Sequence, residues 1–305
     1  MRMRSKKPAY LTNSQKAYFS HSFVNYCDVQ LDEITISGKF HMQQNTVYLK
    51  EHGWRQAYDR NRTPKQQYDL LRVDENGEFT TIASLIKNPF ARNSWRIDTS
   101  NHLESKEEKQ KIVSLRKRFY DTHITRLDIA FNFVNYPDAG MLYDLYNTSK
   151  KRATFQDRAG RLNGYVYGAG GSSGTQYRYY DKLAELSGTK KTVPDTVHTW
   201  ERLELATKGK DKIKNWNNDA LKMLNCFKCN NLDKLMLTDT KTFLMLYGLI
   251  HNPPAMPRLS KRTQAKYRKL IKENMGFDVT LSEDATSALN QNKTNLIQEI
   301  QAFMD

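Results

Sequence analysis

The sequence has few cysteines and no long apolar segment. Its three cysteines are too few for a disulfide framework. Cys226 and Cys229 form a lone C-x-x-C, for which reduced thiols are the favoured interpretation and a zinc site the alternative, because zinc needs about four ligands. The basic start, residues 1–7, lacks the apolar stretch of a signal peptide. No apolar run reaches the roughly 18 residues of a spanning helix, so we expect a cytoplasmic protein with no membrane partner.

Acidic residues are in the minority. The chain of 305 residues has 48 Lys and Arg against 33 Asp and Glu, a formal net charge of +15. Such an excess attracts a polyanion through release of its condensed counterions. Nucleic acid is therefore the expected partner, with an acidic membrane surface as the alternative.

Strand patterns dominate the first two thirds of the chain. Residues 28–54 and 68–81 alternate and are rich in β-branched and aromatic residues, and Asn76-Gly77 within the second stretch favours a hairpin turn. Helical spacing predicts helices at 104–119 and 138–149. Strand patterns return at residues 124–134, 164–167, 176–182 and 199–207. This order predicts an α+β fold: a large, mostly antiparallel curved sheet with helices packed on one face.

The chain changes character after Lys208, where strand patterns stop. Helical periodicity follows at residues 232–249, 260–275 and 290–303, with a break at Asn252-Pro253-Pro254. We therefore expect a strand-rich core over residues 1–208 and a helical C-terminal region over 209–305.

Three predicted strands repeat the pattern Arg, apolar residue, acid. The repeats are Arg96-Ile97-Asp98, Arg126-Leu127-Asp128 and Arg202-Leu203-Glu204. Alternation along a strand places the Arg and the acid of each repeat on one face. Carboxylates among arginines suit Mg²⁺ or Mn²⁺ beside a phosphate, as phosphoryl transfer requires. The alternative is a ladder of salt bridges, since the same pattern begins at Arg72, beside a predicted turn.

A tyrosine stands among cations at 178–182. Alternation places Arg178, Tyr180 and Lys182 on one face, where the cations would lower the phenol's pKa from its ordinary value of about 10. Such a tyrosine is a candidate nucleophile, and packing is the alternative role for any one of the 17 tyrosines. The stretch 168–174 upstream, with four glycines, is predicted to be a flexible loop where DNA could approach.

A basic helix is predicted near the C-terminus, with Ser260 as its cap. Its cations within residues 258–275 resemble those of a DNA-contacting helix, with a merely solvated basic helix as the alternative. The candidate DNA-binding residues are Arg258, Lys261, Arg262, Lys266, Arg268 and Lys269.

In combination these blocks resemble the Rep_trans family, the rolling-circle replication initiators of small Gram-positive plasmids, with which some conjugative-element relaxases share a core. The resemblance spans residues 30–275 and rests on 31–40, 95–98, 125–133, 178–185, 200–205 and 265–272, in the family's order. It implies that the chain nicks and rejoins origin DNA, leaving a 5′-phosphotyrosine link and a free 3′-hydroxyl primer.

The resemblance also implies roles for single residues. Tyr180 is the implied nucleophile, Asp128 and Glu204 are the implied ligands of Mg²⁺ or Mn²⁺, and Asp98 is a further candidate ligand. The sequence departs from the family at Asn132, where a second acid is common. It also departs between Trp200 and Arg202, where one extra residue leaves Glu201 competing with Glu204. No two histidines stand two residues apart, so the paired-histidine metal site of other nickases is not expected.

The implied partners are an origin with an inverted repeat, a second copy of the chain and a host DNA helicase. Two other functions remain open: a relaxase of a conjugative or mobilisable element, with the same chemistry at another DNA site, and a DNA-binding regulator without catalysis. The residues around 258–262 depart most from the family, so we expect origin discrimination there.

Overall fold

The structure is a computed structural model. It describes residues 7–8, 25–73, 77–91, 93–100, 103, 105–136, 140–156, 160, 162–168, 174–188 and 191–305. Most of the loop predicted at 168–174, most of the turn at Asn76-Gly77 and nearly all of the basic N-terminal start lie outside these residues.

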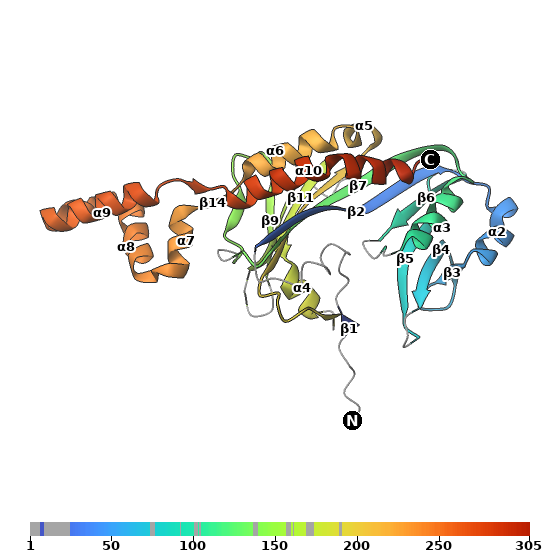
Figure 1. Cartoon of the computed structure of the whole chain (residues 1–305), viewed down its shortest axis with the longest axis horizontal. Helices are drawn as coiled ribbons and strands as arrows, with labels where there is room; N and C mark the ends of the chain where they lie inside the picture. The colour runs from blue at the N-terminus through green and yellow to red at the C-terminus, as the bar shows by residue number, and fades with distance from the viewer. Residues whose placement is uncertain are drawn as a thin grey trace, which may run out of the picture.

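One large curved sheet organises the protein (Figure 1). Its strands are β2 (Tyr26–Lys39), β3 (Trp54–Tyr58), β4 (Pro64–Val73), β5 (Phe79–Lys87), β6 (Ser94–Thr99), β7 (Tyr120–Val134), β9 (Arg152–Gln156), β10 (Leu162–Tyr167), β11 (Gly174–Asp181) and β13 (Trp200–Lys208). They run in the order β3-β4-β5-β6-β2-β7-β13-β11-β10-β9, and every neighbouring pair is antiparallel. The predicted α+β class, with its antiparallel curved sheet, is confirmed.

Two smaller sheets accompany the large one. Strands β8 (Tyr143–Leu145), β14 (Phe227–Asn230) and β15 (Phe277–Asp278) form an antiparallel trio, in which β14 is central. Asn230 of β14 pairs with Phe277 of β15. The third sheet is a parallel pair of β1 (Lys7–Pro8) and β12 (Lys191–Thr192).

Helices cover one face of the large sheet (Figure 1). The helical elements are α2 (Met42–Glu51), α3 (Lys106–Arg116), α4 (Lys182–Gly188), α5 (Lys210–Ile213), α6 (Trp216–Cys226), α7 (Asn231–Thr238), α8 (Thr240–His251), the 3-10 helix η1 (Pro253–Arg258), α9 (Lys261–Asn274) and α10 (Thr280–Ala302). Helices α6 and α10 lie side by side along the sheet. None of the described helices is both long and apolar enough to cross a membrane.

The apolar core lies between this sheet face and helices α6 and α10. Ile129 and Phe131 of β7, Leu203 of β13, and Leu289 and Leu296 of α10 are at most 3 % exposed and belong to one cluster. Because successive side chains of a strand point to opposite faces, the residues between them point away from the helices. Most polar residues of β7, β11 and β13 therefore point to the other face, which α6 and α10 leave open and which we call the uncovered face. Helix α4 packs over one end of it, against Val134 and Trp200.

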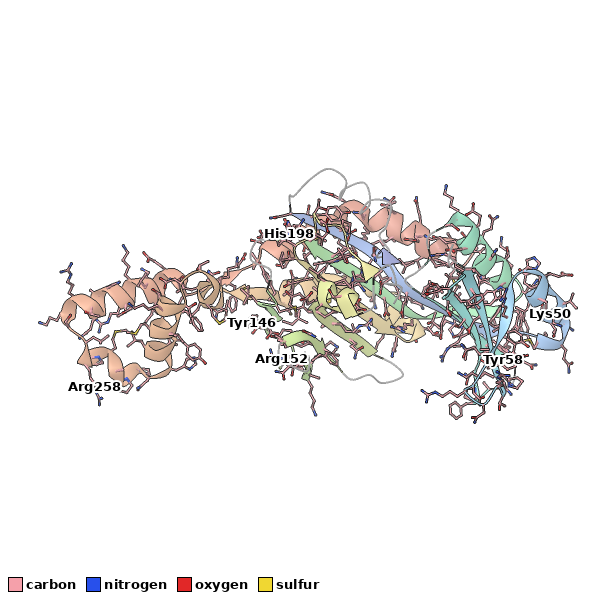
Figure 2. The ribbon with its side chains drawn as sticks, turned by 90° about the horizontal axis from the view of Figure 1, so that it is seen from below. Lys50, Tyr58, Tyr146, Arg152, His198 and Arg258 are labelled. Carbon is pink, nitrogen blue, oxygen red and sulfur yellow. The ribbon has the colours of Figure 1, made fainter. Side chains whose placement is uncertain are left out.

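Helices α7, α8 and α9 form an arm that projects beyond the sheet, with Arg258 near its far end (Figure 2). The arm leaves after β14 and returns before β15, the two strands that pair with each other. Helix α9 begins as predicted, because the Ser260 hydroxyl accepts a hydrogen bond from the Thr263 amide at 3.2 Å. None of its residues is buried, so α9 exposes its whole basic side.

Two local predictions are wrong. The stretch 42–51, expected as part of a strand, is helix α2: its buried residues Asn45, Tyr48 and Leu49 recur at helical spacing. The helix expected at 138–149 is absent from the described part, residues 140–149, which contains the strand β8. Met141 and Asn147 have positive φ angles of 60° and 59°, which no α-helix accommodates.

Most of the remaining elements follow the prediction. Helix α3 lies within 104–119 and starts at a capping box formed by Ser105 and Glu108. The predicted helix at 232–249 is divided into α7 and α8 at Asp239, whose carboxylate accepts a hydrogen bond from the Thr242 amide. The last helix begins ten residues earlier than predicted, at Thr280.

Candidate active site

The candidate site lies on the uncovered face, across the adjacent strands β7, β13 and β11. Arg178 and Tyr180 of β11 stand opposite Glu204 and Arg202 of β13. Asp128 of β7 stands opposite Ala206, which is two residues beyond Glu204 on β13. Sheet register therefore brings two of the three repeats together with the tyrosine motif, whereas Arg96 and Asp98 of the third repeat lie on β6.

The phenol of Tyr180 donates a hydrogen bond to Glu204 Oε1 at 2.7 Å. Burial raises the pKa of Tyr180 far above its ordinary value, and although Arg202 opposes this shift, the charge of Glu204 adds to it. This corrects the expectation that flanking cations lower the phenol's pKa. Arg178 is engaged by acids, and Lys182, 5.8 Å from the centre of the Tyr180 ring, binds Glu185 at 2.7 Å.

Glu204 is buried, and its carboxylate is placed to take the phenol's proton. Burial raises its pKa, as does the negative charge of Asp32, whereas Arg178 and Arg202 act in the opposite direction. A carboxylate of raised pKa is a stronger base than an exposed one. The arrangement pairs the candidate nucleophile with an adjacent carboxylate.

Tyr180 is packed beside a residue without a side chain. Gly164 of β10 stands opposite it, and a Cβ placed on Gly164 would lie 2.8 Å from the Tyr180 Cβ. Such a contact is shorter than real Cβ atoms show. Glycine is thus required here for Tyr180 to keep its position.

Arg178 bridges the two acids that were predicted as metal ligands. Its Nη2 lies 3.0 Å from Asp128 Oδ2 and 2.8 Å from Glu204 Oε2. Asp128 also accepts a hydrogen bond from Arg126 Nε at 2.9 Å. Burial raises the pKa of Asp128, and Arg126 opposes the shift. Within the described residues, no three His, Cys, Asp or Glu side chains are placed to share a metal ion.

Arg202 is held by a buried network that the sequence did not indicate. Its Nε donates to Asn132 Oδ1 at 2.8 Å and its Nη1 to Asp32 Oδ1 at 3.0 Å. Asn132 in turn donates to Asp28 at 2.6 Å. These two hydrogen bonds fix the guanidinium beside Tyr180. Asn132 thus orients a cation at the place where the family often has an acid.

A β-bulge adds two further acids. The pairing of β2 with β7 shifts between Leu31 and Glu33, so Asp32 is the extra residue. Asp32 binds Arg202, while Glu33 lies 2.8 Å from Arg126 Nη1. Simple alternation would place these neighbours on opposite faces, so sequence periodicity could not assign both to the site.

Glu201 and Glu204 point to opposite faces of β13, and Glu204 shares the face of Tyr180. Glu201 accepts hydrogen bonds from the Tyr179 hydroxyl and from the amides of Gly140 and Met141. Its role is therefore structural, on the core side. Asp98 lies apart as well: it is on β6, two strands from β7, and pairs with Arg96 at 3.0 Å.

The candidate DNA-binding residues are all exposed and lie on the arm. Arg258 ends η1, and the others follow along α9, which Figure 2 shows well separated from the sheet. The structure therefore divides the predicted site residues into two groups, one on the sheet and one on the arm.

No family model matches the chain. It is similar to two replication initiation proteins of Staphylococcus aureus, with 28% identity over 214 residues and 29% over 219 residues. These matches cover 69% and 68% of this chain but only 64% and 63% of the relatives, less than two thirds of their length.

Among solved structures, a rolling circle replication initiator protein from Geobacillus stearothermophilus is similar over 66% of this chain and 86% of its own, with 10% identity and a TM-score of 0.38. The sequence matches by themselves support the resemblance derived from the motifs: this chain is similar to staphylococcal replication initiation proteins.

Proposed function

We propose that the chain initiates rolling-circle replication of a plasmid by nicking its origin. The hydrogen bond from the Tyr180 phenol to the buried Glu204 carboxylate carries the proposal, because it pairs a nucleophile with a base. The similarity to replication initiation proteins supports it, as does the net charge of +15.

The proposed reaction is an in-line displacement at phosphorus. Tyr180 Oη bonds to the scissile phosphorus while its proton passes to Glu204 Oε1, and the bond from phosphorus to O3′ breaks. The leaving O3′ takes a proton from solvent and becomes the primer hydroxyl, Glu204 returns its proton to solvent, and the 5′ phosphate stays on Tyr180. Attack of a 3′-hydroxyl on this phosphotyrosine reverses the step and closes the strand. General-base help of this kind contributes about 10²–10⁴ in rate.

Two arginines supply positive charge for the phosphate. Arg202 is opposite Tyr180 in the sheet and is fixed by Asn132 and Asp32. Arg178 contacts the acid that takes the proton. Guanidinium groups bind phosphate oxygens through paired hydrogen bonds, and fixed charges stabilise a transition state without reorganisation. Lys182, over the Tyr180 ring, completes the cationic surroundings.

The proposed cofactor is Mg²⁺ or Mn²⁺ at Asp128 and Glu204. The donor chemistry is right, since both ions prefer carboxylate oxygens, and a bound ion would polarise the phosphate. In the arrangement described, however, the Arg178 guanidinium lies between the two acids. The reaction above is therefore derived without a metal-bound step. Nicking with and without EDTA tests the dependence.

We propose that the arm provides origin recognition. Arg258, Lys261, Arg262, Lys266, Arg268 and Lys269 would contact duplex DNA beside the nick, with some fixing register on phosphates and others reading base edges. A second copy of the chain, bound to the other half of an inverted repeat, and a host helicase are the proposed partners. The proposed place of action is the cytoplasm, where plasmid DNA is found.

A nicking assay on supercoiled plasmid tests the function. Wild-type protein should relax plasmid carrying the origin and remain covalently attached to the 5′ end of the cut strand. Binding without relaxation or attachment would favour the DNA-binding regulator. Equal chemistry at a transfer origin, with no replication of the plasmid in cells, would favour the relaxase.

A further inference from the structure

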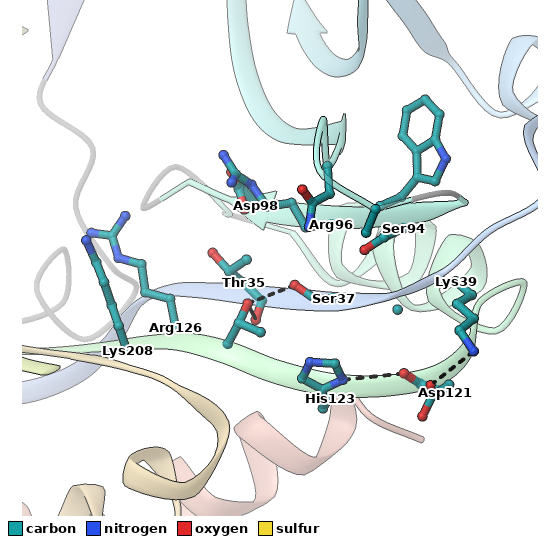
Figure 3. A pocket seen from close by; sticks show the side chains of 15 residues that line it. Thr35, Ser37, Lys39, Ser94, Arg96, Asp98, Asp121, His123, Arg126 and Lys208 are labelled. Carbon is teal, nitrogen blue, oxygen red and sulfur yellow. Dashed lines mark hydrogen bonds and ion pairs between the residues drawn. The ribbon is translucent and has the colours of Figure 1, made fainter. Parts of the chain in front are cut away.

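A basic trough lies beside the candidate active site on the uncovered sheet face (Figure 3). It has a volume of about 630 Å³, and its floor is formed by β6, β2 and β7. Lys208 and Arg126 stand at one end, whereas Lys39 and His123 stand toward the other (Figure 3). None of the groups assigned to nicking or to origin recognition accounts for this trough.

Cations outnumber acids in the trough. Lys39, Arg96, Arg126 and Lys208 carry permanent positive charges, against the two carboxylates of Asp98 and Asp121. Lys39 and Asp121 are both mostly exposed and 3.7 Å apart, so their ion pair is weak. Lys208 has no acidic ion-pair partner in the part of the chain that the structure describes. Arg96 is paired with Asp98, and Arg126 with Glu33 and Asp128, so Lys208 and Lys39 are the trough cations that remain available to a ligand.

Hydroxyl groups line the floor between the two basic ends. The hydroxyls of Ser37 and Thr125 are 2.9 Å apart, and Thr35 lies beside them on β2 (Figure 3). Hydroxyls and cations together are the groups that contact phosphate and sugar in DNA complexes.

The trough is continuous with the candidate active site through Arg126. Arg126 lines the trough and binds Asp128, which is itself bound by Arg178 of the site. Arg126 and Lys208 are also direct neighbours across β7 and β13. A chain that occupies the trough therefore leads toward Tyr180.

The floor of the trough, three strands wide, is narrower than a DNA duplex. Three neighbouring strands span about 10 Å, since adjacent strands lie roughly 4.8 Å apart. The major groove of B-DNA alone is about 12 Å wide. We propose that the trough binds the sugar-phosphate backbone of single-stranded DNA, next to the nicked phosphate. As a part of DNA nicking, this role depends on the proposed function, but its binding test does not.

Binding of a fluorescein-labelled 12-nucleotide oligothymidine tests the trough. Its affinity is measured by anisotropy between 50 and 300 mM NaCl, with full-length protein carrying Tyr180→Phe to prevent cutting. Each phosphate contact with a single strand adds about 0.7 to the salt slope. Lys208→Gln and Lys39→Gln should each lower the slope by about 0.7, and together by about 1.4. Lys208→Arg, which keeps the charge, should restore it.

Lys222→Gln is the matched control, because Lys222 is an exposed lysine of α6, on the covered face. It should leave the slope unchanged. The proposal is overturned if the trough variants keep the wild-type salt slope or if Lys222→Gln lowers the slope equally. It is also overturned if the trough variants lower the salt slope for a duplex of the same length more than they lower it for the single strand.

The two proposals fail in different measurements. If the wild type does not relax plasmid but Lys208→Gln still lowers the salt slope of oligothymidine binding by about 0.7, the proposed nicking function is wrong and the proposed binding of single-stranded DNA in the trough stands. If the wild type nicks plasmid but the trough variants keep the wild-type salt slope, the proposed binding in the trough is wrong and the proposed nicking function stands.

Discussion

Tyr180 and Tyr179 are neighbours in sequence but face opposite sides of β11. Tyr180 binds Glu204 on the uncovered face, whereas Tyr179 is buried in the core and binds Glu201. We expect Tyr180→Phe to abolish nicking and covalent attachment while origin binding stays within twofold, because only bond formation needs the hydroxyl.

Tyr179→Phe is the control for this change. It removes a buried hydroxyl from Glu201, so it should lower the free energy of unfolding by about 1–3 kcal/mol and still form the adduct. Gel analysis of protein-linked DNA distinguishes the variants, and an adduct from Tyr180→Phe would assign the nucleophile to another residue.

Glu33 gives the stability a predictable dependence on pH. Burial raises its pKa from 4.5 to about 7, although Arg126 opposes the shift. The folded state thus holds the proton more tightly than the unfolded state. The stabilisation is complete below about pH 4.5 and is lost as the pH rises toward 7. Glu33→Gln cannot titrate, so its stability relative to the wild type should improve between pH 5 and pH 8.

Chemical denaturation at the two pH values measures the effect of Glu33. Glu51→Gln, at an exposed position of α2, is the comparison and should change little between them. The same difference from the wild type at pH 5 and pH 8 for Glu33→Gln would contradict the expected titration.

At the scale of elements, the pairing of β10 with β11 positions Tyr180, the proposed nucleophile. Gly164→Ala would place its Cβ 2.8 Å from the Tyr180 Cβ and 2.9 Å from the Tyr179 carbonyl oxygen. Overpacking of this kind costs about 1–3 kcal/mol. We expect that loss of unfolding free energy together with a slower nicking rate, because Tyr180 must move away from Glu204.

Gly248→Ala is the control for Gly164→Ala. No atom lies within 4 Å of a Cβ placed on Gly248, which is in α8, so alanine should stabilise the helix by about 0.5–1 kcal/mol. Thermal melts and single-turnover nicking separate the two variants. An unchanged nicking rate in Gly164→Ala would show that the strand pairing does not hold Tyr180.

Long periodic elements could be predicted from the sequence, and short or tertiary-determined ones could not. Strand alternation assigned Asp128 and Glu204 to one face, and the sheet register placed Arg178 between them. Helix α2 was missed because few apolar residues mark its buried side. The strand β8 was missed because it exists only through pairing with β14, far along the chain. Asp32 joined the site through a bulge, which alternation cannot predict.

At the scale of the whole molecule, the basic arm lies apart from the large sheet, which carries Tyr180 and Glu204 (Figure 2). If the arm selects the origin, exchanging residues 256–264 for those of a relative with another origin should transfer binding preference. Nicking of a single-stranded oligonucleotide should stay unchanged, because Tyr180 and Glu204 are not altered. Affinities for both origins at fixed salt measure the preference, and the wild-type preference in the exchanged protein would place recognition outside this segment.

The attachment of the arm has a consequence for how such proteins diversify. Its two ends, Asn230 and Phe277, are paired neighbours in β14 and β15, about 5 Å apart. A segment whose ends meet in this way can be lengthened, shortened or exchanged without disturbing the strands that carry Tyr180. If the arm selects the origin as proposed, recombination between plasmids that share a host would change the origin specificity in one event and leave the proposed nicking residues unchanged. The initiators of competing plasmids would then differ first in residues 231–276, whereas the sequences of their sheet strands would stay similar.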